Sequence, residues 1–259
     1  MPGARSTSIL GGCGVALAGV IALMLAGCAT ARHATVALAP ISIQTVKYYP
    51  FQVKGYQQSF PNRRIMVLTA VDARDFKEAS TFNHQPYLGH PAIGVILDHQ
   101  GQVIQRLYGP DLDPLVRTGI AQSAREAGMT ASTSTLPLHD ALRARGAEYL
   151  LVAKILGMWV VKQRGADRQG GPGWFSAADV ALDVTIYKPP FAVPFWHGMS
   201  VAEYDDPPKP SAGASPEDET EIYDRPGEVL SVALTRAVAG IFRREDLRTL
   251  VQQDTIPAR

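Results

Sequence analysis

The chain has 259 residues, with 25 basic and 24 acidic side chains and a formal net charge of +1. A charge this close to zero argues against a protein that binds nucleic acid through a broad basic face. The length is sufficient to bury a hydrophobic core without disulfides, and the only cysteines are Cys13 and Cys28.

The first 27 residues predict a secretory signal peptide. Arg5 is the one charged residue before an uncharged, apolar run from Ile9 to Leu25, which is the layout of an export signal. The run is long enough to raise the alternative of an uncleaved transmembrane anchor. Against that alternative, its glycines lower the hydrophobicity, and it ends in small residues and a cysteine rather than in a basic cluster.

The stretch Leu25-Ala26-Gly27-Cys28 resembles the lipobox of bacterial lipoproteins. The resemblance implies cleavage before Cys28, a palmitate-type lipid anchor on its thiol, and no disulfide in the mature domain. Two or more acyl chains hold a protein stably on a membrane. A similar motif ends at Cys13, but the apolar run before it is too short for an export signal. Because Ala29 stands where an inner-membrane retention signal usually has Asp, the resemblance favours the periplasmic face of the outer membrane.

The rest of the chain is expected to hold a tether at 28–40 and a single domain at 41–252. Apolar runs, alternation and turn residues predict the strands, while helical spacing and capping residues predict the helices. The expected strands are 41–49, 64–72, 92–97, 102–108, 148–161, 179–188 and 195–204, and the expected helices are 113–128, 138–145, 226–242 and 246–252. Asp113 is the expected N-cap of the first helix. This order predicts an α+β fold, with helices packed on one face of a largely antiparallel or mixed sheet.

Residues 205–226 predict a flexible, acidic, proline-rich loop. The stretch from Glu203 to Glu228 contains nine acidic residues, two basic residues and five prolines. Such a composition buries little apolar surface. A calcium site within 217–224 is the alternative, but this segment lacks the glycine and the ligand spacing of an EF-hand loop.

No motif in the sequence assigns a catalytic residue, a metal ligand or a cofactor. His84, His90 and His99 are close in sequence but lack the spacing of metal ligands, which indicates exposed loop histidines. The glycine-rich stretch 170–173 has a proline where a phosphate-binding loop needs an amide, and it predicts a hairpin tip. Asp72 and Arg74 follow a buried strand, where a structural ion pair is favoured over an acid–base role.

Trp174 and Phe175 follow this glycine-rich tip. One interpretation is that they begin the next strand and cover the edge of the core. The functional interpretation is a contact patch for a protein partner or a membrane surface, because aromatic side chains supply much of the binding energy of interfaces. Trp174 and Phe175 are therefore the candidate partner contacts.

Several short motifs resemble the YajG-type lipoproteins. They are Val71-Asp72-Ala73-Arg74, Gly94, Glu126-Ala127-Gly128, and Ile241 to Leu247 followed by Leu250. The stretch from Gly146 to Leu151 is similar to the helix–strand unit of lipoproteins with a TolB-amino-terminal-like domain. The resemblance implies an envelope lipoprotein and supplies no catalytic residue. The acidic segment departs from both patterns.

Three functions follow as hypotheses. The first is a non-enzymatic, lipid-anchored envelope protein that acts as a binding or accessory subunit of an envelope complex. The second is a lipid-transport accessory protein that binds an acyl ligand in a cleft between the sheet and the terminal helix, where a deep apolar pocket is expected. The third is a hydrolase with dispersed catalytic residues, which needs a nucleophile, a base and an orienting group within hydrogen-bond reach.

Overall fold

A computed structural model of the chain describes residues 60, 62–75, 86, 88–166, 172–210 and 219–254. Side chains are described for all of these residues except 166, 172, 207–210 and 219–225. All described residues belong to one compact unit that spans Leu38–Arg259. The signal peptide, Cys28, the tether and the expected strand at 41–49 lie outside the described residues.

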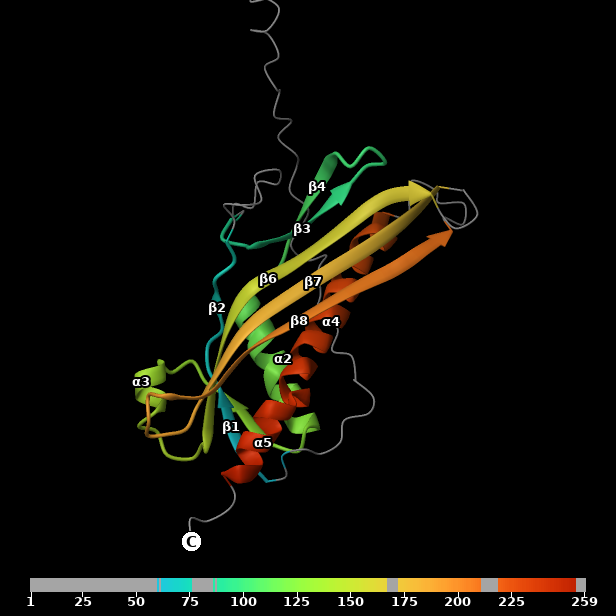
Figure 1. Cartoon of the computed structure of the whole chain (residues 1–259). Coiled ribbons are helices and arrows are strands. Elements are labelled where there is room, and N and C mark those ends of the chain that lie inside the picture. The colour runs from blue at the N-terminus through green and yellow to red at the C-terminus, as the bar shows by residue number, and fades with distance from the viewer. Residues whose placement is uncertain are drawn as a thin grey trace, which may run out of the picture. The chain divides into compact units, whose positions relative to one another are not determined.

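The described part of the chain forms an eight-stranded mixed sheet with four helices, which is an α+β fold (Figure 1). The strands are β1 Arg64–Val67, β2 Val71–Asp72, β3 Ala92–Leu97, β4 Val103–Tyr108, β5 Thr130–Thr133, β6 Tyr149–Ala166, β7 Pro172–Tyr187 and β8 Pro194–Pro210. The helices are α2 Leu112–Glu126, α3 Leu138–Ala141, α4 Glu219–Arg243 and α5 Glu245–Gln253.

The long strand β6 organises the sheet. Along one edge it pairs in parallel with β1 near its start, at Ile65 opposite Tyr149, and with β3 near its end, at Gly94 opposite Val160. Along the other edge it pairs antiparallel with β7 over its whole length, and β7 pairs antiparallel with β8. In the described residues β8 pairs with β7 alone, so its other edge is open.

The hydrophobic core lies between this sheet and helices α2 and α4, which lie side by side behind β6, β7 and β8 in Figure 1. The expected alternation of β7 is confirmed. Every second residue from Val180 to Ile186 is buried, and the residues between them are more exposed. The helical stripe that begins at Leu230 and ends at Ile241 is buried against this face of the sheet. The one-turn helix α3 instead packs on the opposite face, beside Leu68 and Leu150.

Several boundaries differ from the sequence-based expectation; the expected strand at 64–72, for example, is divided into β1 and β2. The N-cap of α2 is Asp111, whose carboxylate accepts a hydrogen bond from the backbone N–H of Asp113. Asp113 is not the cap. Its carboxylate accepts from the backbone N–H of Ala70 at 2.6 Å and pairs with Arg117 at 3.2 Å, which links the segment between β1 and β2 to the helix. Asp111 and Asp113 are both suitable N-cap residues. Asp111 caps the helix, because the carboxylate of Asp113 instead accepts the hydrogen bond from Ala70.

The expected loop at 205–226 is shorter at both ends. Strand β8 continues to Pro210, because the edge of β7 extends to Gly173 and offers partners that far. Proline is tolerated on an edge strand, where its missing N–H breaks no hydrogen bond of the sheet. Helix α4 begins at Glu219 and includes Pro226. The remainder of that loop, 211–218, lies outside the described residues.

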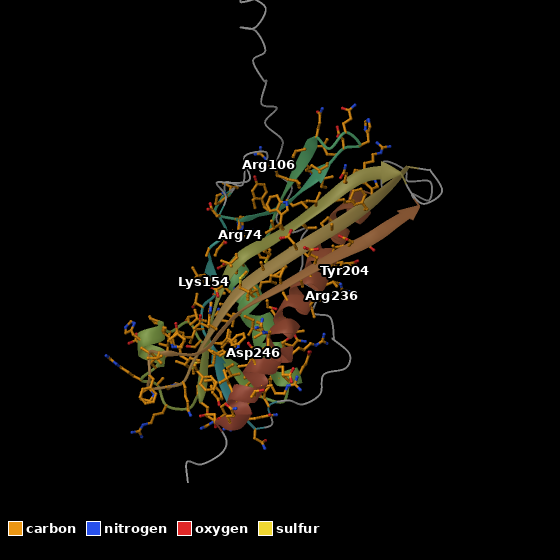
Figure 2. All side chains as sticks on the ribbon, in the orientation of Figure 1. Arg74, Arg106, Lys154, Tyr204, Arg236 and Asp246 are labelled. Atoms are coloured by element: carbon orange, nitrogen blue, oxygen red, sulfur yellow. The ribbon has the colours of Figure 1, made fainter. Side chains whose placement is uncertain are left out.

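Arg74 is a buried structural arginine at the junction of three strands. Its guanidinium donates to the carbonyl oxygens of Ala92 at 2.8 Å and Met158 at 3.1 Å, and it forms the predicted ion pair with Asp72 at 2.8 Å. Figure 2 labels it beside β2. Burial raises the pKa of Asp72, but the hydrogen bonds and charge of Arg74 outweigh burial, so that this pKa lies below its ordinary value. Arg74 therefore joins β2, β3 and β6.

We expect Arg74→Ala to lower the free energy of unfolding by about 3 kcal/mol, because it leaves buried carbonyl groups and Asp72 without their donor. Chemical denaturation of the two proteins measures this loss. Arg74→Lys is the matched variant. It keeps the charge but cannot donate in several directions from one plane, so most of the loss should remain. Full stability in the lysine variant would show that charge alone matters here.

Candidate functional site

The outer face of the sheet is the face of β6, β7 and β8 that points away from α2 and α4. Alternation along paired strands places one set of side chains there. From the register, and from its exposure for Leu156 at the irregularity between Ile155 and Gly157, they are Val152, Lys154, Leu156, Trp159 and Val161 on β6, Phe175, Ala177, Asp179, Ala181, Asp183 and Thr185 on β7, and His197, Met199, Val201, Glu203 and Asp205 on β8. The two long core helices, α2 and α4, pack on the other side of the sheet. The short helix α3 packs on this face at one end.

An apolar strip crosses the middle of the outer face. It consists of Leu156, Ala181, Met199 and Val201, and Ala181 stands directly opposite Val201 in the register. Met199 is 52% exposed, Val201 is 59% exposed and Leu156 is 38% exposed. Large apolar side chains gathered on one exposed sheet face indicate an interaction surface more strongly than the same residues scattered singly.

An acidic pair flanks the apolar strip. Asp179 on β7 stands directly opposite Glu203 on β8, and like charges in this position destabilise a sheet. The Asp179 carboxylate leans over Gly157, where an added Cβ would lie 3.3 Å from Oδ2. Burial, and then the charge of Glu203, raise the pKa of Asp179. The ionised carboxylate of Asp179 therefore destabilises the folded protein. A cation from a bound partner would remove this destabilisation.

A second charged cluster flanks the strip on its other side. Asp183 lies between Lys154 and His197, at 3.8 Å from the Lys154 ammonium and 2.5 Å from Nε2 of His197 (Figure 2 labels Lys154). The Asp183 side chain is partly buried, whereas the side chains of both partners are more exposed. The strip therefore borders a compensated ion cluster on one side, where Met199 stands directly opposite Asp183, and on the other side an acidic pair to which the described residues bring no cation in an ion pair.

Two arginines from the helices cover the open edge of β8. Arg236 donates to the carbonyl oxygen of Glu203 at 3.3 Å, and Arg244 donates to that of Met199 at 3.4 Å. The Arg236 guanidinium also lies 4.7 Å from the centre of the Tyr204 ring, a pair that Figure 2 labels. Charged side chains on an edge strand discourage pairing with another strand. The outer face, rather than the strand edge, is therefore the surface most open to a partner.

The two candidate contact residues lie on opposite faces of β7. Trp174 packs against the core on the helix side, with the Lys162 ammonium 5.3 Å from its ring centre. Phe175 lies on the outer face opposite Gln163, and it is half-buried. Nothing in this placement tests a contact role, so that role remains a prediction. Its geometry limits any direct contact on the outer face to Phe175.

The other sequence-predicted groups are not brought together. His90 follows the turn at 88–89 and His99 lies in the turn between β3 and β4, whereas His84 lies outside the described residues. Among the described residues no group of three histidines, cysteines, aspartates or glutamates could hold a metal ion. No helix of the described part of the chain is both long and apolar enough to span a membrane.

The expected cleft between the sheet and the terminal helix is closed where Ser200 of β8 contacts α4. Ser200 donates a hydrogen bond to the carbonyl oxygen of Ala237 at 2.6 Å. A Cβ added to Gly240 would lie only 2.6 Å from the Ser200 hydroxyl, so glycine permits this close approach. An acyl chain cannot pass between β8 and α4 at this point.

Comparison with known proteins supplies no family assignment. No protein-family model and no curated protein sequence matches the chain. Among solved structures, a Xanthomonas campestris protein of the DUF330 family model has a TM-score of 0.43 and 10% identity, covering 81% of this chain and 96% of its own. A neuraminyllactose-binding hemagglutinin homologue from Helicobacter pylori has a TM-score of 0.40 and 8% identity, covering 81% and 99%.

The PelC dodecamer from Paraburkholderia phytofirmans has a TM-score of 0.32 and 10% identity, covering 76% of this chain and 95% of the PelC chain. All three similar structures come from bacterial proteins. With TM-scores below 0.5 and identities of 10% or less, they assign no activity, ligand or partner to this chain. The resemblance to YajG-type lipoproteins remains a prediction.

We expect Asp179→Asn to raise the melting temperature at neutral pH. A carboxyl whose pKa is raised on folding destabilises the native state wherever it is ionised. Both states are protonated at pH values well below the ordinary carboxyl pKa of about 4, so the difference should vanish there. It should grow as the pH rises from the ordinary pKa to the raised pKa and stay constant above that. Thermal unfolding of both proteins across this range measures it, and an equal or lower melting temperature at neutral pH would contradict the assignment.

Proposed function

We propose that the protein is a non-enzymatic, lipid-anchored component of the bacterial cell envelope that binds a protein partner through the outer face of its sheet. The observation that carries the proposal is the apolar strip, which is exposed on an otherwise regular sheet face between two charged clusters. The sequence supports the envelope location through the signal peptide and the lipobox-like motif that ends at Cys28. The location proposed is the periplasmic face of the outer membrane.

The outer face favours a partner of particular chemistry. The apolar strip can be buried by aliphatic or aromatic side chains, and the acidic pair Asp179 and Glu203 can be neutralised by lysine or arginine. Asp205 follows Glu203 on the same face and extends the negative charge. A partner segment with apolar residues beside a basic group would match the strip and the pair together.

Photocrosslinking in intact cells tests the partner. We expect a photoreactive amino acid at position 201 to capture a discrete protein, because Val201 is exposed in the middle of the strip. The matched control is position 104, since Ile104 is also a strand residue and is 46% exposed, but it lies on β4. The same adduct at both positions, or none at position 201, would contradict the proposed face.

The double substitution Met199→Thr and Val201→Thr should reduce crosslinking to the partner several-fold. Because position 201 is then substituted, the photoreactive amino acid is placed at position 156 for this experiment. Threonine keeps the β-branched character that strands favour and removes apolar surface. Because both residues are exposed, the free energy of unfolding should change by less than about 0.5 kcal/mol per site. Ile104→Thr is the control and should leave capture intact. Unchanged capture in the double variant would show that the strip does not bind the partner.

Cys28→Ser tests the anchor separately from the partner. If Cys28 carries the lipid, the variant should accumulate as unprocessed precursor and should lose fatty-acid labelling. Cys13→Ser should change neither property, because that motif lacks an adequate apolar region. Metabolic labelling with a palmitate analogue, followed by electrophoresis, measures both. Labelling that survives in the Cys28→Ser protein would refute the anchor assignment.

A further inference from the structure

The connection between β7 and β8 carries the most exposed aromatic residue of the described chain. Phe191 is 64% exposed and Val193 is 73% exposed, and the residues between Pro190 and Pro194 are exposed as well. Isolated exposed apolar residues are common on soluble proteins. Here, however, a phenylalanine and a valine protrude from one short loop at the end of a sheet. Burial of that tip in an apolar medium would be favourable.

The base of this tip is firmly held. The backbone N–H of Phe191 donates to the carbonyl oxygen of Lys188 at 3.0 Å, which closes a tight turn. Lys188 forms an ion pair with Asp254 at the end of α5. On the other side of the loop, the ring of Phe195 lies 5.4 Å from that of Tyr149, measured between centroids. Contacts on both sides of the loop therefore hold its two ends in place.

Basic residues lie at the same end of the molecule. Tyr187, the last residue of β7, packs against the small cluster that contains Ala141 and Leu142 of the α3 region. The turn that follows α3 carries Arg143 and Arg145, both exposed. Figure 1 shows α3 beside the connection between β7 and β8, at the end of the sheet opposite β4.

Leu136 adds to the apolar surface at this end. It immediately precedes the α3 turn and is also exposed. The combination of protruding Phe, Val and Leu with nearby arginines is the composition of a surface that lies in the interfacial zone of a membrane. Aliphatic and aromatic tips enter the acyl boundary, and cationic groups lie at the level of the phosphates.

We propose that this end of the domain, formed by the β7–β8 loop and the α3 turn, inserts into the headgroup region of an anionic phospholipid membrane. Two protruding residues on a narrow loop offer too little area for a standard protein interface, which buries about 800 Å² on each partner. A lipid surface needs no matching shape, and it supplies both the apolar medium and the negative charge. The site is separate from the outer-face strip and does not depend on a protein partner.

Insertion would also fix an orientation. The loop joins β7 and β8, the two strands that carry most of the outer face. If the domain were held at this end, its long strands would extend away from the membrane. The outer face would then run parallel to the membrane normal and would not lie against the lipid. A lipid anchor alone, attached through a tether, would leave that orientation free.

The test uses the full lipid-anchored chain reconstituted into vesicles of phosphatidylethanolamine and phosphatidylglycerol. An environment-sensitive fluorescent amino acid replaces Phe191, and matched proteins carry it at Ile104 or Val201. We expect acyl chains brominated near the headgroup to quench the emission from position 191 strongly and to leave the emission from positions 104 and 201 unchanged. Equal quenching at all three positions, or none at position 191, would overturn the proposal.

Two further measurements separate the lipid from other occupants. Arg143→Ser combined with Arg145→Ser should reduce the quenching at position 191 in these vesicles, but not in vesicles of phosphatidylcholine alone. An identical result in both lipids would overturn the anionic character of the surface. A photoreactive amino acid at position 191 should label lipid in intact cells. Capture of a discrete protein there instead would overturn the membrane assignment and make the loop a second protein contact.

Discussion

The antiparallel pairing of β6 with β7 is the constraint on which the rest of the structure depends. It runs without interruption from Leu150 opposite Tyr187 to Ala166 opposite Pro172, apart from one irregularity between Ile155 and Gly157. Because side chains alternate along paired strands, this one register decides which residues meet α2 and α4 and which meet solvent. A shift by one residue would bury Asp179 and Asp183 and expose Val180 and Leu182. The core and the candidate binding face are therefore two consequences of the same pairing.

The C-terminal helices contribute more than apolar burial to this sheet. Asp246 accepts from Nε1 of Trp196 at 3.2 Å and pairs with Arg244, whose guanidinium reaches the edge of β8. Asp254 accepts from the Tyr149 hydroxyl at 2.7 Å and pairs with Lys188. Burial raises the pKa of Asp254, but the hydrogen bonds from Lys188 and Tyr149 outweigh it and lower that pKa. The contacts of Asp246 and Asp254 attach α5 to the ends of β6, β7 and β8. The contact of Arg244 covers part of the open edge of β8.

The local pattern of apolar and polar residues was sufficient to predict most helices and strands. It was insufficient to predict which strands pair with one another in the sheet. The apolar run at Glu148 and the alternation from Asp179 identified β6 and β7, because burial on one or two faces leaves a direct mark on the sequence. Strand β5 was missed, since Thr130–Thr133 is polar and is held by parallel pairing with β1 rather than by burial. The capping role of Asp111 was assigned to Asp113 because both residues suit it, and only the contact with Ala70 separates them.

The candidate site was harder to predict because its signal is a cross-strand arrangement. Met199 and Val201 look like ordinary strand residues in the sequence, and the sequence does not show that no long helix of the described residues covers their side of the sheet. Trp174 and Phe175 are adjacent in the sequence, but adjacent residues of a strand point to opposite faces, so the sequence pair does not show which of them lies on the outer face. The register of β7 against β8 was needed to place Asp179 opposite Glu203.

The apolar strip and the acidic pair have one physical property in common. Both cost free energy in the isolated chain, the strip through exposed apolar surface and the pair through repulsion between two facing carboxylates. Each cost disappears in a complex, provided that the partner brings apolar side chains to the first and a cation to the second. Neither feature has a structural role comparable to that of Arg74 or Asp254, which satisfy buried or helix-end groups within the fold. The features that are unfavourable in the free protein are therefore concentrated where a partner can relieve them, and this argues for the outer face as a binding surface.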